Sequence, residues 1–255
     1  MSTTTTAHAP ATALQRVVNV MRLHFANPWT TIILPWMILG VIFAANVALW
    51  WLILTNLDSS ADRSDVADGL QYSGASMFIF FYMTVVAVQA ISVTFPFALG
   101  YGVTRRDYYL GSALTFVVLA AMYSAGMTVL SVIEEATGGW GLGGRMFTAV
   151  YFGDGGWPER LFVFFTAFLF FLFVGAAIAT IWVRWKAMGL TAFFVILGLI
   201  VIVAFAVLTF TSGWAVVGDF FAGAGWLGSF AWSLVVTAAA GITGFFILRR
   251  ATPRT

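Results

Sequence analysis

The chain has 255 residues, of which 61% are hydrophobic, 17% are aromatic and only 9% are charged. This composition is far from that of a soluble globular protein and indicates an integral membrane protein. The net charge of +2 comes from scattered basic residues, which gives no indication of nucleic-acid binding. Cysteine is absent, which excludes disulfides, thiolate nucleophiles and cysteine-built metal sites.

The N-terminal 27 residues divide into a tail and a predicted helix. We expect residues 1–13 to be disordered because they offer little to bury. Residues 14–27 alternate apolar and basic positions at helical spacing, which predicts an amphipathic helix lying in the membrane interface. Its defining residues are Leu14, Arg16, Val17, Val18, Met21, Arg22 and Phe25. The alternative is a cytoplasmic extension of the first span, but Asn27-Pro28 favours a bend.

Six apolar segments follow, and each reaches or exceeds the roughly 20 residues that cross a bilayer. They cover residues 29–54, 73–101, 108–133, 161–183, 187–212 and 227–248. The predicted fold is an all-α membrane protein with six transmembrane helices. The loops and tails are too short for a separate soluble domain, so residues 1–255 form one transmembrane domain.

The charges between the spans are sorted by sign when segment ends are assigned alternately to two sides. One side carries Arg16, Arg22, Arg105, Arg106, Arg184, Lys186, Arg249, Arg250 and Arg254, and the other carries only Arg63, Arg145 and Arg160. Every acidic residue except Asp107 falls on the second side. The excess of basic residues predicts that both termini are cytoplasmic.

The outer loops and the later spans have further features from which local structure can be predicted. We expect Glu134 and Glu135 to form a solvated helix end, and the glycine-rich residues 138–144 to begin a flexible outer loop of about 25 residues. The phenylalanines of 161–183 surround the helix, which favours contact with lipid. Residues 213–226 are apolar apart from Asp219, and both a re-entrant hairpin and an ordinary outer loop remain open.

Small residues recur every four positions along the last span. Such a row lets another helix approach closely. We expect packing within one subunit, with a subunit interface as the alternative. The row consists of Gly225, Ser229, Ser233, Thr237 and Gly241.

The chain lacks the residues for most kinds of catalysis. It has two histidines, and Trp185 precedes its single lysine, so no histidine-built zinc site, Ser-His-Asp triad or P-loop can form. We expect no catalytic residue, metal or cofactor, and the sequence assigns no substrate-binding residue. The spans also carry no acidic, basic or histidine side chain of the kind that ion-coupled transporters use. Uphill transport would therefore need a separate ATP-hydrolysing subunit.

The run from Phe97 to Gly111 resembles the cytoplasmic turn after the second span in ABC-2 type transporter permeases, especially the small six-span permeases of Gram-positive bacteria. The resemblance extends to the plan of nearly the whole chain. It implies a bacterial plasma-membrane location, a partner ATPase that binds ATP and magnesium, and a second permease subunit of the same or similar sequence. It also implies that the turn couples to the ATPase through Gly102, Val103, Thr104, Arg105, Arg106, Asp107 and Tyr108.

A turn this short transmits a push to both flanking spans, and its charged residues can bond a partner surface. Alternatively, Arg105 and Arg106 serve only as topology anchors; Asp107, which such anchoring does not require, favours coupling. The expected function is export of a hydrophobic or amphipathic substrate. The alternative is a non-transporting membrane anchor, sensor or immunity protein that binds another membrane complex, and an intramembrane enzyme ranks last.

Overall fold

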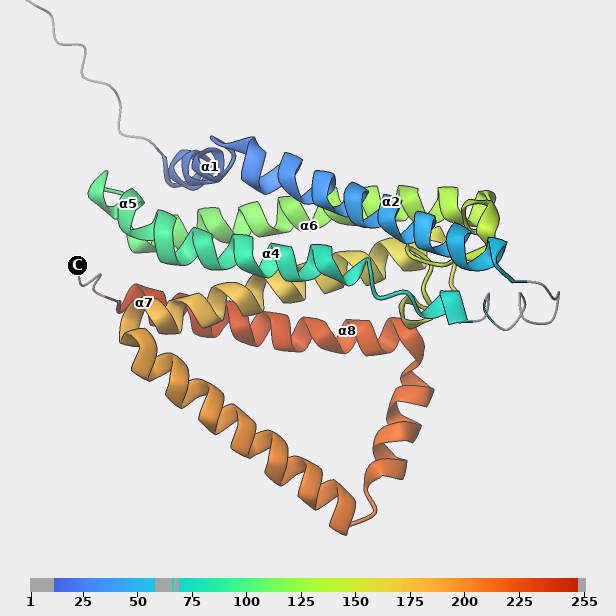
Figure 1. Cartoon of the computed structure of the whole chain (residues 1–255). Coiled ribbons are helices and arrows are strands. Elements are labelled where there is room, and N and C mark those ends of the chain that lie inside the picture. Colours follow the sequence, from blue (N-terminus) through green and yellow to red (C-terminus); the bar gives the residue numbers. More distant parts are fainter. Residues whose placement is uncertain (1–11, 58–65, 67–68, 252–255) are drawn as a thin grey trace, which may run out of the picture.

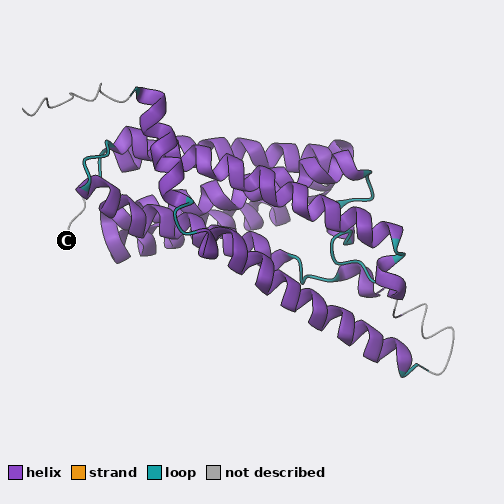
Figure 2. Cartoon of the chain, turned by 90° about the horizontal axis from the view of Figure 1, so that it is seen from above, coloured by secondary structure: helices purple, strands orange, loops and turns teal. Residues whose placement is uncertain are grey.

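The computed structural model describes residues 12–57, 66 and 69–251, and every regular element in these ranges is helical (Figures 1 and 2). Most of the expected tail, most of the acidic segment 56–70 and Arg254 lie outside the described residues. The elements are α1 (Ala13–His24), η1 (Trp29–Ile33), α2 (Leu34–Thr55), η2 (Leu70–Tyr72), α4 (Met77–Gln89), η3 (Ala90–Thr94), α5 (Phe95–Gly100), α6 (Arg105–Ala136), η4 (Gly139–Gly143), η5 (Val150–Phe152), α7 (Trp157–Phe210) and α8 (Trp214–Arg249).

Five helical stretches in the described part are long and apolar enough to cross a membrane: Trp29–Thr55, Leu70–Gly100, Arg105–Ala136, Trp157–Phe210 and Trp214–Arg249. The predicted all-α class is thus confirmed, and these stretches are compatible with a membrane protein. The predicted fourth and fifth spans both fall within α7, which has 54 residues. Lys186 inside α7 has φ 55° and ψ −149°, and Figure 1 shows the helix turning sharply at this level.

The core lies where α7 packs against α4 and α6. Phe80 of α4 and Phe168 of α7 have ring centroids 4.6 Å apart, and Tyr123 of α6 adds a third buried ring. Phe164 and Phe168 are fully buried, so the expectation that the phenylalanines of this span face lipid is wrong for them. The phenylalanines surround the helix because α7 has packed neighbours on more than one side.

Two prolines account for the π-helical segments within the first two spans. Pro35 has no N–H to donate to the carbonyl of Thr31, four residues earlier, and its ring crowds that carbonyl. The helix widens there, and the Thr31 carbonyl accepts a hydrogen bond from the Tyr123 hydroxyl instead, at 2.7 Å. Pro96 likewise follows the second segment, η3, and cannot donate to the carbonyl of Ser92. Within η3 the Tyr108 hydroxyl donates to the carbonyl of Ala90.

Residues 187–224, here called the arm, leave the bundle. Figure 1 shows the second part of α7 diverging from the other helices and the first part of α8 returning to them. None of these residues is buried. Gly225, with φ 64°, breaks α8 where it rejoins the bundle. The segment 213–226, for which a loop and a re-entrant hairpin were both open, is helical from Trp214 to the break at Gly225.

The glycine-rich outer segment packs onto the bundle rather than extending from it. Met146, Phe147, Ala149 and Phe152, which follow the glycines, are at most 3% exposed. The Trp140 ring contacts Phe43 of α2 at 4.6 Å between centroids. The expectation of a flexible outer loop is therefore wrong for residues 139–152, because aromatic and apolar side chains between the glycines anchor the segment.

Candidate functional site

Helix α1 lies across one end of the bundle. Figure 1 shows it nearly end-on, so its axis runs across the direction of the spans. Its first turn is closed by a capping box, in which Thr12 and Gln15 exchange side-chain to backbone hydrogen bonds. Leu14 is 71% exposed and available to a membrane surface, whereas Val20 is buried against α6. The predicted amphipathic helix is therefore present, and its place in a membrane interface stays a prediction.

The contact between α1 and α6 depends on Gly111. A Cβ atom at this position would lie 2.5 Å from the Val20 Cβ and 2.8 Å from the Val17 carbonyl oxygen. The absence of a side chain at Gly111 therefore sets how closely the two helices approach. The remaining predicted apolar residues of α1, Val18, Met21 and Phe25, are partly buried at the same end of the bundle.

An ion pair joins the two helices beside this contact. Arg16 Nε lies 2.7 Å from Asp107 Oδ2, and the Asp107 side chain is only 8% exposed. Thr104 begins α6 as its N-cap and accepts a hydrogen bond from the Asp107 backbone N–H at 3.1 Å. An acidic residue in the first turn is also favoured by the helix dipole. The sequence suggested that Asp107 bonds a partner protein. In the structure Asp107 is paired with Arg16 of the same chain.

The turn between α5 and α6 presents its other charges differently. Arg105 donates from Nη1 to the carbonyl of Arg249, at 3.2 Å, which ties the start of α6 to the end of α8. Arg106 and Tyr101 are exposed. Gly102, with φ 80°, makes the reversal. Two exposed side chains therefore remain on a turn that is anchored at both sides.

Tyr108 and Val103, the other members of the predicted coupling loop, face inward. Tyr108 is fully buried, and its ring packs edge-on against His24 at 5.7 Å between centroids. Val103 lines a groove of about 410 Å³ between α1, α5 and the start of α6. The groove has an apolar floor and a rim that carries Arg16 and Asn19, so it could receive an apolar side chain of a partner.

The predicted small-residue row lies along α8. Thr237 is buried, and the Gly241 carbonyl accepts a hydrogen bond from the Tyr109 hydroxyl at 2.6 Å. Gly225 is the break in the helix, and the hydroxyls of Ser229 and Ser233 donate to carbonyls of their own helix. The second part of the row therefore packs within this chain.

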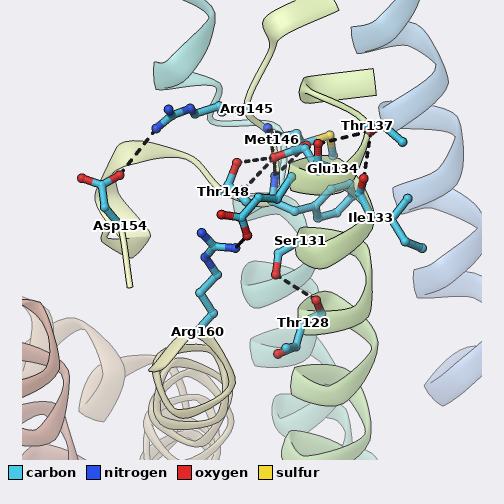
Figure 3. A network of polar contacts seen from close by, with 12 residues as sticks. Thr128, Ser131, Ile133, Glu134, Thr137, Arg145, Met146, Thr148, Asp154 and Arg160 are labelled. Atoms are coloured by element: carbon cyan, nitrogen blue, oxygen red, sulfur yellow. Dashed lines mark hydrogen bonds and ion pairs between the residues drawn. The ribbon is translucent and has the colours of Figure 1, made fainter. Parts of the chain in front are cut away.

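A second polar network lies at the opposite end of the bundle (Figure 3). Glu134 is 1% exposed and accepts hydrogen bonds from Trp140 Nε1, from the Thr148 hydroxyl and from the backbone N–H groups of Met146, Phe147 and Thr148. The expectation of a solvated Glu134 is wrong. The segment after α6 folds back over the helix end, and its N–H groups converge on this carboxylate.

Two ion pairs lie beside Glu134, and most of their residues are more exposed than Glu134. Arg160 pairs with Glu135 at 2.7 Å and is buried, whereas Glu135 is exposed, as expected. Arg145 lies 3.5 Å from Asp154. The Glu-Glu pair before a glycine-rich segment was the only signal of this network in the sequence, and it does not reveal which glutamate is buried.

No cluster of three or more His, Cys, Asp or Glu side chains suited to a metal ion occurs among the described residues. Comparison with protein-family models, curated proteins and solved structures finds no match to this chain.

Proposed function

We propose that the chain is the membrane-spanning permease subunit of an ABC-2 type transporter in a bacterial plasma membrane, exporting a hydrophobic or amphipathic substrate. A separate subunit would bind ATP and magnesium and hydrolyse the ATP. In this proposal both termini are cytoplasmic, α7 crosses the membrane twice with its turn at Lys186, and a second permease subunit completes the path.

The observation that supports the proposal most is the mechanical linkage at the α1 end. The turn after α5 is held to α1 through the ion pair of Arg16 with Asp107, and to α8 through the contact of Arg105 with Arg249. A force applied to the exposed Arg106 would therefore reach three helices at once. A coupling element needs this property, whereas a topology anchor does not.

The composition of the spans supports two further parts of the proposal, the external energy source and the hydrophobic or amphipathic substrate. The predicted spans contain no acidic, basic or histidine side chain that could carry a proton or bind an ion. Energy for uphill movement would then enter from outside the bundle. Apolar and aromatic spans also suit a hydrophobic or amphipathic substrate better than an ionic one.

The test is capture of an ATPase by the tagged full chain from its own membranes in mild detergent. We expect an ATPase with a P-loop to copurify, and the double variant Arg105→Glu/Arg106→Glu to retain at least about tenfold less of it. Arg184→Glu/Arg250→Glu is the matched control, because it reverses two exposed charges expected on the same side. Membrane insertion of each variant is checked separately, since basic residues influence topology.

Two results would overturn the proposal: no ATPase with the unaltered chain, or full retention by the Arg105→Glu/Arg106→Glu variant. Capture of a different membrane complex without an ATPase would instead support the anchor, sensor or immunity function.

A further inference from the structure

A cavity of about 290 Å³ lies between the end of α1, the two π-helical segments η1 and η3, and α6. Its polar lining contains no acidic side chain, lysine or arginine. The polar side chains of the lining are those of His24, Asn27, Thr30, Thr31, Gln89, Thr94 and Thr115. Val86, Phe116 and Leu119 complete an apolar wall. Uncharged hydrogen-bonding groups thus converge in a region that is otherwise apolar.

Gln89 is the most informative of these residues. It lies about 18 Å along the helix from Met77 and about 16 Å from Gly100, near the middle of the span. Its side chain is exposed and makes no hydrogen bond with any described residue. A primary amide left unpaired in hydrocarbon is strongly unfavourable, because nothing there replaces its hydrogen bonds with water. Water or a bound molecule must therefore meet it.

The walls of the cavity are held open by its own hydrogen bonds. Thr31 belongs to η1, and Ala90 and Thr94 belong to η3. The carbonyls of Thr31 and Ala90 accept hydrogen bonds from the hydroxyls of Tyr123 and Tyr108, so the wider turns are fixed rather than collapsed. Single π-helical turns of this kind occur frequently at functional sites.

The chemistry of the lining selects for an uncharged ligand. His24 Nε2 lies 2.9 Å from the Ser112 hydroxyl, and burial lowers the pKa of His24 to about 4. The imidazole is therefore neutral at pH 7, and no other ionisable group lines the cavity. A charged group entering it would be desolvated without a counter-ion, whereas an amide or hydroxyl group would find donors and acceptors.

We propose that this cavity is a water-accessible binding site for the uncharged hydrogen-bonding group of an amphipathic molecule, with Gln89 as its main hydrogen-bonding residue. The alkyl part of such a molecule can remain in lipid beside the exposed face of the same helix, which carries Val85 and Val93. The role of the site in transport rests on the proposed function, but binding itself does not.

The absence of cysteine in the chain permits a direct test. Thr94→Cys places a thiol in the cavity, and Val93→Cys places one on the next residue, which is 67% exposed but lies outside the lining. In native membranes, N-ethylmaleimide should label Thr94→Cys at least about tenfold faster, because the reactive thiolate forms only where water reaches the sulfur.

The second step tests the ligand class. Octanamide should slow labelling of Thr94→Cys, while octylammonium and octanoate at the same concentration should not. Adding Gln89→Leu should abolish the protection by octanamide, and the control Val85→Leu should preserve it. Labelling of Thr94→Cys before any ligand is added reports whether each double variant keeps the cavity.

Labelling of Thr94→Cys no faster than Val93→Cys would overturn the water-accessible site. Equal protection by octylammonium or octanoate, no protection by octanamide, or protection that survives Gln89→Leu would overturn the ligand assignment. The outcome is separate from that of the ATPase capture: octanamide protection without a copurifying ATPase would keep the site and reject the transporter.

Discussion

At the level of single residues, the buried Glu134 carboxylate is expected to stabilise the fold through the hydrogen bonds that it accepts. Gln in its place would turn an N–H group toward donors that now bond to a carboxylate oxygen. Glu134→Gln should therefore lower the free energy of unfolding by about 1–3 kcal/mol. Thermal unfolding in detergent measures this. Glu135→Gln is the matched control, since Glu135 is exposed and has one arginine partner; equal losses in both variants would contradict the prediction.

His24 makes the stability of the chain depend on pH. Its pKa is about 4 in the folded chain and about 6.5 in an unfolded one, so only the unfolded state takes up a proton as the pH falls from 6.5 towards 4. Stability should fall by about 1.4 kcal/mol per pH unit in this window and be fully present above it.

The measurement for His24 is the unfolding temperature in detergent at pH 7.5 and pH 5. His24→Asn retains a side-chain donor towards Ser112 but does not titrate, so its loss between the two pH values should be smaller. An identical loss in the unaltered chain and in His24→Asn would show that other groups cause the pH dependence.

At the scale of elements, the docking of α1 depends on one missing side chain. Gly111→Ala places a methyl group against the Val20 side chain and the Val17 backbone, so α1 must move outward at a cost of about 1–3 kcal/mol. Trypsin should then cut after Arg16 and Arg22 faster than in the unaltered chain, because cleavage requires local opening. Gly40→Ala, a glycine in α2 with no atom within 4 Å of the new Cβ, should leave cleavage unchanged.

Periodicity and apolar length predict the elements well and their contacts poorly. The predicted helix 14–27 corresponds to α1 (Ala13–His24), and the span 108–133 lies within α6. The pair of Arg16 with Asp107 joins positions 91 residues apart, which no local pattern reveals. For the same reason the burial of Glu134 was missed: it depends on a later segment that folds back over the helix end.

At the scale of the whole molecule, the two ends of the bundle have different chemistry. Arg16, Arg105 and Arg249 meet at one end, and the network of Glu134 and Arg160 closes the other. The pair of Arg16 with Asp107 and the contact of Arg105 with Arg249 bring α1, the turn between α5 and α6, and the end of α8 together. Helix α1 and the end of α8 therefore lie at the same end of the bundle.

The number of times that the chain crosses the membrane depends on whether the arm, residues 187–224, spans it. If α7 turns at Lys186 and crosses again, the α7–α8 connection lies on the side opposite to the turn between α5 and α6. Single cysteines at four exposed positions, Tyr101, Asp154, Met188 and Phe210, test this with a membrane-impermeant maleimide. In intact cells Asp154→Cys and Phe210→Cys should be labelled, whereas Tyr101→Cys and Met188→Cys should react only after permeabilisation. Labelling of Phe210→Cys only after permeabilisation, as for Tyr101→Cys, would contradict a second crossing of the membrane by α7.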